Sequence, residues 1–429
     1  MPDRLIRIGL AAAALTCLAG QAQADEPAEA ADGGDEAALA DELQELEEQD
    51  SQLHIYGFAD FTYTHFLMDR SSGWFDAYFS RYPTFAVGNV NLYLEKKIAP
   101  RWHSLLEFRL LYLPNGTETV SSTGEVAQID TAVLDYQDKA EVLHWGGVSI
   151  ERAWVEYQAH PLLTIRAGQW LTPYGIWNAD HGSPVLIGIR RPFVIGLSLF
   201  PKSQTGLELY GSRSFGDKSL TYHLTVSNGR GPVDSYLDLD YNKAVGGRLV
   251  FEAPWFDEFK VGASAYTGTF TRRARSYNLA LTAVETTNDV TEGYRELAVA
   301  ADLHLRSGPL IVNAEAISNQ KVYRDDARPR DTQTPTGQLP DSHSYGAYVI
   351  AAYRLPWLGL MPYVHGEGLR TQWPTVPNIW VAGAGINVRA SPTVTLKVQL
   401  QRAWVPGTVS LVVPDEPVTM ADAQVAWVF

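Results

Sequence analysis

The feature that most constrains this chain is an alternation of apolar and polar side chains that begins near His54 and continues to its end. In 394–401 four apolar residues occupy the even positions, and the odd positions hold one Thr, one Lys and two Gln. Segments 220–227 and 296–305 follow the same rule. Because successive side chains of a strand point to opposite faces, each segment predicts a strand with one apolar and one polar face.

The alternation predicts a chain of sixteen strands, most of them about ten residues long, which is enough for a tilted strand to cross a bilayer. They are expected at 53–66, 86–97, 101–113, 148–158, 162–169, 203–212, 219–228, 241–251, 258–270, 292–305, 309–319, 343–355, 359–370, 379–389, 394–404 and 420–429. Short connections containing Pro or Gly alternate with long ones such as 170–202, 271–291 and 320–342. This asymmetry is typical of outer-membrane barrels, which have short periplasmic turns and long outer loops.

The composition agrees with a barrel. No apolar run after the first residues is long enough for a membrane helix. The mean hydropathy of −0.14 is close to neutral and 11% of the residues are aromatic. Alternating lipid-facing and lumen-facing residues produce such an average. The predicted fold class is all-β: a transmembrane antiparallel β-barrel of about sixteen strands over 53–429, preceded by a short periplasmic helix.

The N-terminal residues have the pattern of a cleavable signal peptide. Arg4 and Arg7 precede a short apolar run, and Ala22-Gln23-Ala24 supplies the small residues that a signal peptidase needs. We expect cleavage after Ala24, so that residues 1–24 are removed on export. The only cysteine, Cys17, lies in this segment, and the mature chain is expected to contain no disulfide.

Residues 25–52 predict an acidic periplasmic linker that ends in a helix. Residues 25–50 contain 12 acidic residues and no Lys or Arg, which accounts for most of the net charge of −15. Leu39, Leu43 and Leu46 begin a heptad pattern, which fits either a short coiled coil or a solvated acidic helix. The remaining charge is nearly balanced, and nothing predicts the basic face of a nucleic-acid-binding protein.

The last strand ends in an aromatic residue. Counting back by twos from Phe429 gives Trp427 and Val425, both apolar, and Gln424 and Asp422 lie between the apolar positions. A terminal aromatic on a lipid-facing strand resembles the signal that the barrel-insertion machinery of bacterial outer membranes reads. We therefore expect that machinery to be a partner and the outer membrane to be the location.

Two segments resemble one family. The stretch Arg166–Asn178 (RAGQWLTPYGIWN), together with the early Tyr56–Asp60 (YGFAD), resembles the phosphate-selective porin O/P-like family. The resemblance covers most of 53–429 in layout and implies a sixteen-stranded, usually trimeric pore with a loop folded inward. The N-terminal heptads are similar to those of dicarboxylate-type porins.

Loop 170–202 is the candidate to narrow the pore, because it ends in Arg190 and Arg191 followed by the stiff Pro192. The alternative is a surface loop with solvated arginines. Placing the polar face of each strand inward adds a set of lumen charges of both signs. The bases are Arg109, Arg152, Arg166, Arg248, Lys260, Arg389 and Lys397, and the acids are Glu107, Glu156, Glu208, Asp302, Glu315 and Glu367.

These features predict a porin for passive diffusion of small hydrophilic solutes, with anions favoured by Arg166, Arg190 and Arg191. The bilayer, lipopolysaccharide, small solutes and a homotrimer are the expected partners. The alternatives are a barrel without an open pore, acting as a receptor or structural protein, and a barrel-type hydrolase using His181 and Ser183. No catalytic motif, metal-ligand spacing or cofactor signature is found in the sequence.

Overall fold

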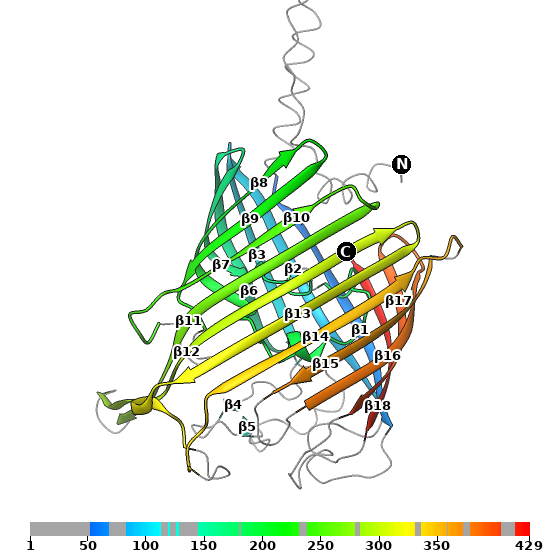
Figure 1. Ribbon diagram of the computed structural model, residues 1–429. Helices are drawn as coiled ribbons and strands as arrows, with labels where there is room; N and C mark the ends of the chain where they lie inside the picture. The colour runs from blue at the N-terminus through cyan, green and yellow to red at the C-terminus, as the bar shows by residue number, and fades with distance from the viewer. Residues whose placement is uncertain are drawn as a thin grey trace, which may run out of the picture.

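The computed structural model shows a closed antiparallel barrel (Figure 1). The structure describes residues 52–67, 83–112, 119–120, 126–127, 145–179, 182–230, 238–278, 284–330, 336–357, 359–371, 378–404 and 417–429. The expected signal peptide 1–24, and residues 25–51 with the expected helix, lie outside these residues.

Sixteen strands among the described residues form the barrel, and β1 pairs with β18 to close it. They are β1 (His54–Leu67), β2 (Thr84–Ala99), β3 (Trp102–Tyr112), β6 (Trp145–His160), β7 (Leu163–Leu171), β8 (Ser203–Phe215), β9 (Lys218–Ser227), β10 (Ala244–Glu252), β11 (Glu258–Asn278), β12 (Val284–Ser307), β13 (Leu310–Tyr323), β14 (Ser342–Tyr353), β15 (Leu360–Arg370), β16 (Asn378–Arg389), β17 (Val394–Trp404) and β18 (Val418–Val428). Strands β4 (Thr119–Val120) and β5 (Val126–Ala127) form a separate pair. The predicted fold class is confirmed, and each predicted strand overlaps an observed one.

The burial of side chains follows the predicted alternation, with the polar face inside. In β17, Lys397 and Gln399 are each 1% exposed, whereas Val398 and Leu400 are 61% and 54% exposed. A water-soluble protein would show the reverse arrangement. An apolar exterior around a polar interior is what a bilayer requires of a barrel.

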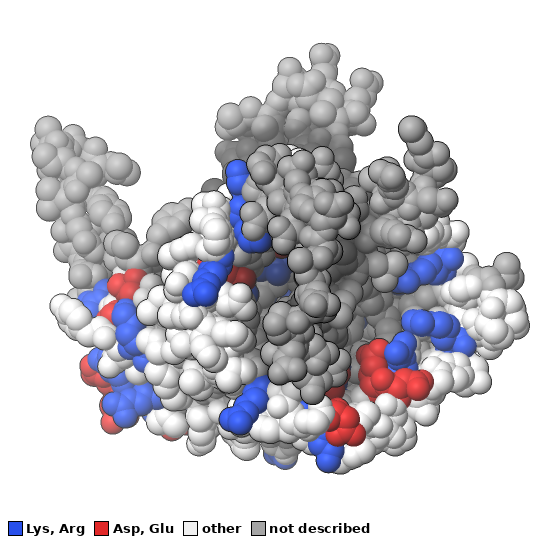
Figure 2. Space-filling view, turned by 90° about the horizontal axis from the view of Figure 1, so that it is seen from above, with Lys and Arg blue, Asp and Glu red and all other residues white. Residues whose placement is uncertain are grey.

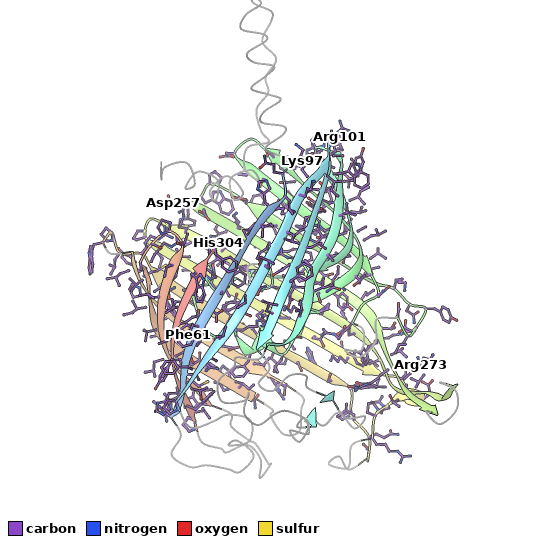
Figure 3. The ribbon with its side chains drawn as sticks, turned by 180° about the vertical axis from the view of Figure 1, so that it is seen from behind. Phe61, Lys97, Arg101, Asp257, Arg273 and His304 are labelled. Carbon is purple, nitrogen blue, oxygen red and sulfur yellow. The ribbon has the colours of Figure 1, made fainter. Side chains whose placement is uncertain are left out.

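The short connections gather at one end of the barrel. Lys97 and Arg101, beside the turn between β2 and β3, lie at the same end as Asp257 before β11, and Arg273 lies at the opposite end (Figure 3). Seen from above the end with the short turns, Lys, Arg, Asp and Glu side chains gather around the rim (Figure 2). Among the described residues no helix is long and apolar enough to cross a membrane.

The prediction of a long loop over 271–291 is wrong for most of that segment. Strands β11 and β12 continue as a paired hairpin, from Arg272 opposite Glu292 to Asn278 opposite Val284. The two-residue alternation fades in this part of the sequence because a hairpin beyond the membrane needs no apolar face. Its backbone ladder continues regardless of the side-chain pattern.

Replacing Leu224 by Lys tests which face of β9 meets lipid. Leu224 is 55% exposed on the outer face, so the charge should cost about 2–4 kcal/mol of unfolding free energy if it lies at mid-depth. The control His223→Lys places the same charge one residue earlier, beside Glu208 in the lumen. Urea unfolding of both variants in lipid vesicles measures the difference, and equal losses would contradict the assignment of faces.

Candidate functional site

The segment between β7 and β8, residues 172–202, folds into the barrel, and we call it the inner loop. Residues 180 and 181 within it are not described. Its backbone and side chains bond to inward-facing residues of β9 and β10 and of β13, β15, β16, β17 and β18. The inner loop therefore lies in the lumen and is not a surface loop.

The start of the inner loop is fixed against β9 and β10. The hydroxyl of Tyr174 lies 2.8 Å from that of Thr225, and Gly246 leaves room for the Tyr174 ring because a Cβ there would meet its hydroxyl. Arg248 donates to the backbone carbonyls of Pro173, at 2.8 Å, and Gly175, and it also pairs with Asp302. Arg248 thus acts as an anchor of the loop.

Glu315 holds the next turn of the inner loop. Its carboxylate accepts the backbone N–H of Trp177 at 2.8 Å and the hydroxyl of Tyr348. Gly175, with φ of +74°, directs the chain past this carboxylate, where a Cβ would lie only 1.9 Å from an oxygen of Glu315. Any other residue at this position would displace the turn.

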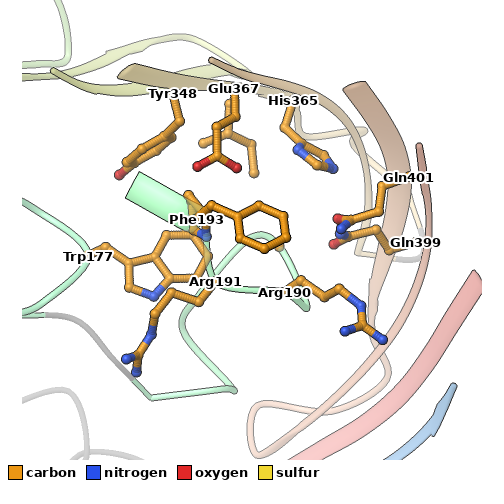
Figure 4. A pocket seen from close by; sticks show the side chains of 12 residues that line it. Trp177, Arg190, Arg191, Phe193, Tyr348, His365, Glu367, Gln399 and Gln401 are labelled. Carbon is orange, nitrogen blue, oxygen red and sulfur yellow. The ribbon is translucent and has the colours of Figure 1, made fainter. Parts of the chain in front are cut away.

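A short helix, α4 (Phe193–Gly196), packs on the wall formed by β14 to β16 (Figure 4). Glu367 accepts the N–H of Val194 at 2.6 Å and so satisfies a first-turn donor that the helix itself cannot. Val194 is fully buried in a cluster that includes the inward-facing Ile350 and Val381. Apolar burial and the carboxylate together hold the helix inside the barrel.

The middle of the inner loop is held by side chains of β16 and β17. Lys397, 1% exposed, donates to the carbonyls of Ser183, at 2.6 Å, and Leu186. Gln399 accepts the N–H of Ile189 at 2.7 Å. Like Arg248, Lys397 is therefore bound to the loop backbone and is not a free charge of the lumen.

The two adjacent loop arginines have different environments, and their guanidinium groups point apart (Figure 4). Arg190 forms a two-pronged ion pair with Asp422 of β18, at 2.6 and 2.7 Å. Arg191 is exposed, and within the described part of the chain it forms no ion pair. Partial burial, followed by the positive charge of Arg109, lowers the pKa of Arg191, and Glu151 opposes this shift.

Arg191 belongs to a cluster of three cations around one carboxylate. Glu151 accepts from Arg109 of β3 at 3.2 Å and from Lys202, the last residue of the inner loop, at 2.8 Å. Burial lowers the pKa of Lys202, and the charges of Arg109 and Arg191 lower it further against the opposing effect of Glu151. This cationic cluster (Arg109, Arg191, Lys202) has a formal net charge of +2 when Glu151 is counted.

The wall beyond the cluster is neutralised by ion pairs. Arg152 pairs with Glu107, and Arg166 bonds to Glu156 at 2.7 Å and to Glu208 at 2.8 Å. The Arg166 guanidinium also lies over the Trp154 ring, 4.3 Å from its centroid. These side chains line the lumen with charges of alternating sign. The charge of Arg166 is neutralised by its two carboxylate partners.

The structure thus divides the predicted pore residues into groups. Only Arg109 and Arg191 of that set lie in the cationic cluster. Arg389 is exposed at the last position of β16, beside the short turn to β17, and Lys260 pairs at 3.6 Å with the half-exposed Glu252. In the described part of the chain neither side chain bonds to the inner loop.

Sequence reasoning missed Glu151, Lys202 and Asp422. Strict alternation places Glu151 outside, but a bulge opposite Glu107 and Phe108 places it inside beside Arg152. The alternation along β18 predicts that Asp422 faces inward, but it gives no indication that Asp422 pairs with Arg190. Lys202 sits at a loop end and gives no sequence signal.

The last residues of the chain complete the closure. The N–H of Phe429 donates to the carbonyl of Gly57 at 3.0 Å, and the N–H of Gly57 donates back at 2.9 Å. Val425 is 37% exposed on the outer face, which Trp427 shares by parity. Recognition of these residues by an insertion machinery stays a prediction. Among the described residues no group of three or more His, Cys, Asp or Glu side chains could hold a metal ion.

Comparison with known proteins identifies the fold. No protein-family model and no curated protein sequence matches the chain. The high-pH structure of OprB from Pseudomonas putida superposes with a TM-score of 0.53 at 9% identity, covering 90% of this chain and 96% of that one. The trimer form of OmpT from Vibrio cholerae gives 0.52 at 8% identity, covering 88% and 99%, and Salmonella typhi OmpF in complex with daunomycin gives 0.50 at 14%, covering 89% and 99%. The chain therefore shares the closed barrel fold of these outer-membrane proteins.

Replacing Lys397 by Met tests whether its bonds hold the inner loop. The variant removes the donors from the Ser183 and Leu186 carbonyls, and each buried group left unpaired costs about 1–3 kcal/mol. We expect noisier single-channel current from a loosened loop. Val398→Met, which adds the same side chain on the outer face, is the control, and a quiet Lys397→Met channel would refute the anchoring role.

Proposed function

We propose that the protein is an outer-membrane pore for passive diffusion of small hydrophilic solutes, and that the cationic cluster gives it a preference for anions. The observation that carries this proposal is the exposed Arg191 on the inner loop. It lies within electrostatic range of Arg109 and Lys202, which share Glu151, and it has no ion pair of its own among the described residues. A net positive constriction attracts anions electrostatically and repels cations.

The two other arginines that the sequence expectation named support this assignment because carboxylates neutralise them. Arg190 is neutralised by Asp422, and Arg166 by Glu156 and Glu208. Selectivity then depends on the few charges that are not neutralised. The sequence expectation named Arg166, Arg190 and Arg191 together, and the geometry favours Arg191 alone of the three.

The cationic cluster fits an oxyanion such as a carboxylate or a phosphate. An Arg guanidinium binds either through paired N–H donors, and a Lys ammonium adds a point charge. Competition by acetate and by inorganic phosphate against chloride current distinguishes the two classes.

Two other functions have less support. A barrel that acts only as a receptor or structural protein needs a closed lumen, and measurable single-channel conductance would exclude it. A hydrolase needs an accessible nucleophile, whereas Ser183 is only 6% exposed and its backbone carbonyl accepts a hydrogen bond from Lys397. We place the pore in the outer membrane as an oligomer, since outer-membrane proteins share the fold and one was solved as a trimer.

Arg191→Gln should lower the ratio of chloride to potassium permeability. At about 7 Å in water, one unit charge changes the energy of a monovalent ion by about 0.6 kcal/mol, or nearly threefold in relative occupancy. Reversal potentials across planar bilayers under a KCl gradient give this ratio. Arg389→Gln, the same change beside a short turn, should leave it unaltered.

Asp422→Asn should move the ratio the opposite way. The substitution removes the partner of Arg190 while keeping the shape of the side chain, and so frees a second cation at the inner loop. The same reversal-potential experiment applies. A cation-selective wild type, or equal shifts for Arg191→Gln and Asp422→Asn, would contradict the proposed site.

A further inference from the structure

A groove of about 910 Å³ lies on the outer surface of the barrel over β12 to β16. Small outward-facing residues line it: Ala301, Ala316, Ala347 and Gly368. The Trp380 ring lies against Gly368, where a Cβ would come within 2.6 Å of it. The volume is in the range of pockets that hold small ligands.

One end of the groove is polar. A neighbouring hollow of about 630 Å³ is lined by Ser318, His343, Tyr345 and Arg370, and three of these side chains also line the groove. The hydroxyl of Ser318 lies 2.9 Å from Nε2 of His343. Since β15 ends at Arg370, this polar end lies away from the short turns, at the end that the proposed function places outside the cell.

The outer surface here carries cations without acids. In β13 to β17 the only acidic residues are Glu315 and Glu367, both buried in the lumen. Arg370 and Arg402 face outward on the same strands. Within the described residues, the one polar contact of the Arg370 guanidinium is with the Tyr345 hydroxyl at 3.4 Å.

Aromatic side chains mark the depth of Arg370 in the membrane. Tyr345 lies opposite Arg370, and Trp380 lies opposite Trp404 on the next strand. All three aromatic residues are outward and exposed. Because Tyr and Trp prefer the boundary between hydrocarbon and headgroups, Arg370 lies at the level of lipid phosphates.

We propose that the groove binds one acidic, phosphate-bearing lipid of the surrounding membrane. An acyl chain lies along Ala316 and Ala347, and the phosphate accepts from the Arg370 guanidinium and the Ser318 hydroxyl. Charge complementarity favours this occupant, because the outer face of these strands carries Arg370 and Arg402 and no carboxylate. The proposal rests on the membrane placement given under the proposed function and is independent of anion preference.

Native mass spectrometry of the full chain, extracted from membranes in mild detergent, tests the proposal. Dioleoyl phosphatidylglycerol is the probe, and dioleoyl phosphatidylcholine controls for the acyl chains. Arg370→Gln should reduce retention of phosphatidylglycerol about fivefold, the effect of one cation near an acidic membrane surface, and leave phosphatidylcholine unaffected. Arg213→Gln, an exposed outward arginine of β8 near a short turn, should change neither lipid.

Ala347→Leu provides a second variant, because it fills the groove and keeps the cation. It should reduce retention of both lipids. Equal binding of both lipids by wild type, or full retention of phosphatidylglycerol by Arg370→Gln, would overturn the proposal. Disulfide-linked oligomers of an Ala347→Cys variant would also overturn it, because they would assign the groove to a contact between subunits. Reversal potentials of Arg370→Gln should equal those of wild type, so failure here is distinguishable from failure of the proposed pore.

Discussion

The hydrogen-bonded ladder between β1 and β18 is the contact on which the rest of the structure depends. A sheet in hydrocarbon cannot leave the N–H and C=O groups of an edge strand unpaired, because no water is present to satisfy them. Pairing from Phe58 opposite Val428 to Leu67 opposite Thr419 removes both edges. The bonds between Gly57 and Phe429 continue the pairing beyond the last strand. With the edges closed, each strand can present one face to lipid and the other to the lumen.

Closure also explains how the inner loop is held. Besides the apolar cluster around Val194, charged and polar side chains such as Glu315, Glu367 and Lys397 serve as partners for backbone groups of the loop. Each such bond relieves two desolvated groups at once. Arg190 is paired with Asp422, whereas Arg191 has no ion pair among the described residues and lies within electrostatic range of Arg109 and Lys202.

Much of the barrel could be predicted from sequence because lipid imposes a local rule on every strand. Where lipid is absent, as in the hairpin of β11 and β12, the rule gave a loop in place of a strand. The site was harder to predict from sequence, since Arg190 and Arg191 are neighbours in the chain and their environments are set by residues on distant strands. One signal was readable: Ile350 and Val381 are apolar on faces that should be polar, which indicates that something packs inside. The bulge that turns Glu151 inward had no such signal.

The central claim is that outward and inward side chains alternate along the strands of a closed barrel, except at bulges such as the one at Glu151. Single-cysteine variants along 219–226 of β9, each carrying a fluorophore in vesicles of brominated lipid, test it most directly, because the only cysteine of the sequence, Cys17, lies in the expected signal peptide. Strong quenching at 220, 222, 224 and 226 with weak quenching at 219, 221, 223 and 225 is the predicted result. Quenching without a two-residue period would contradict it.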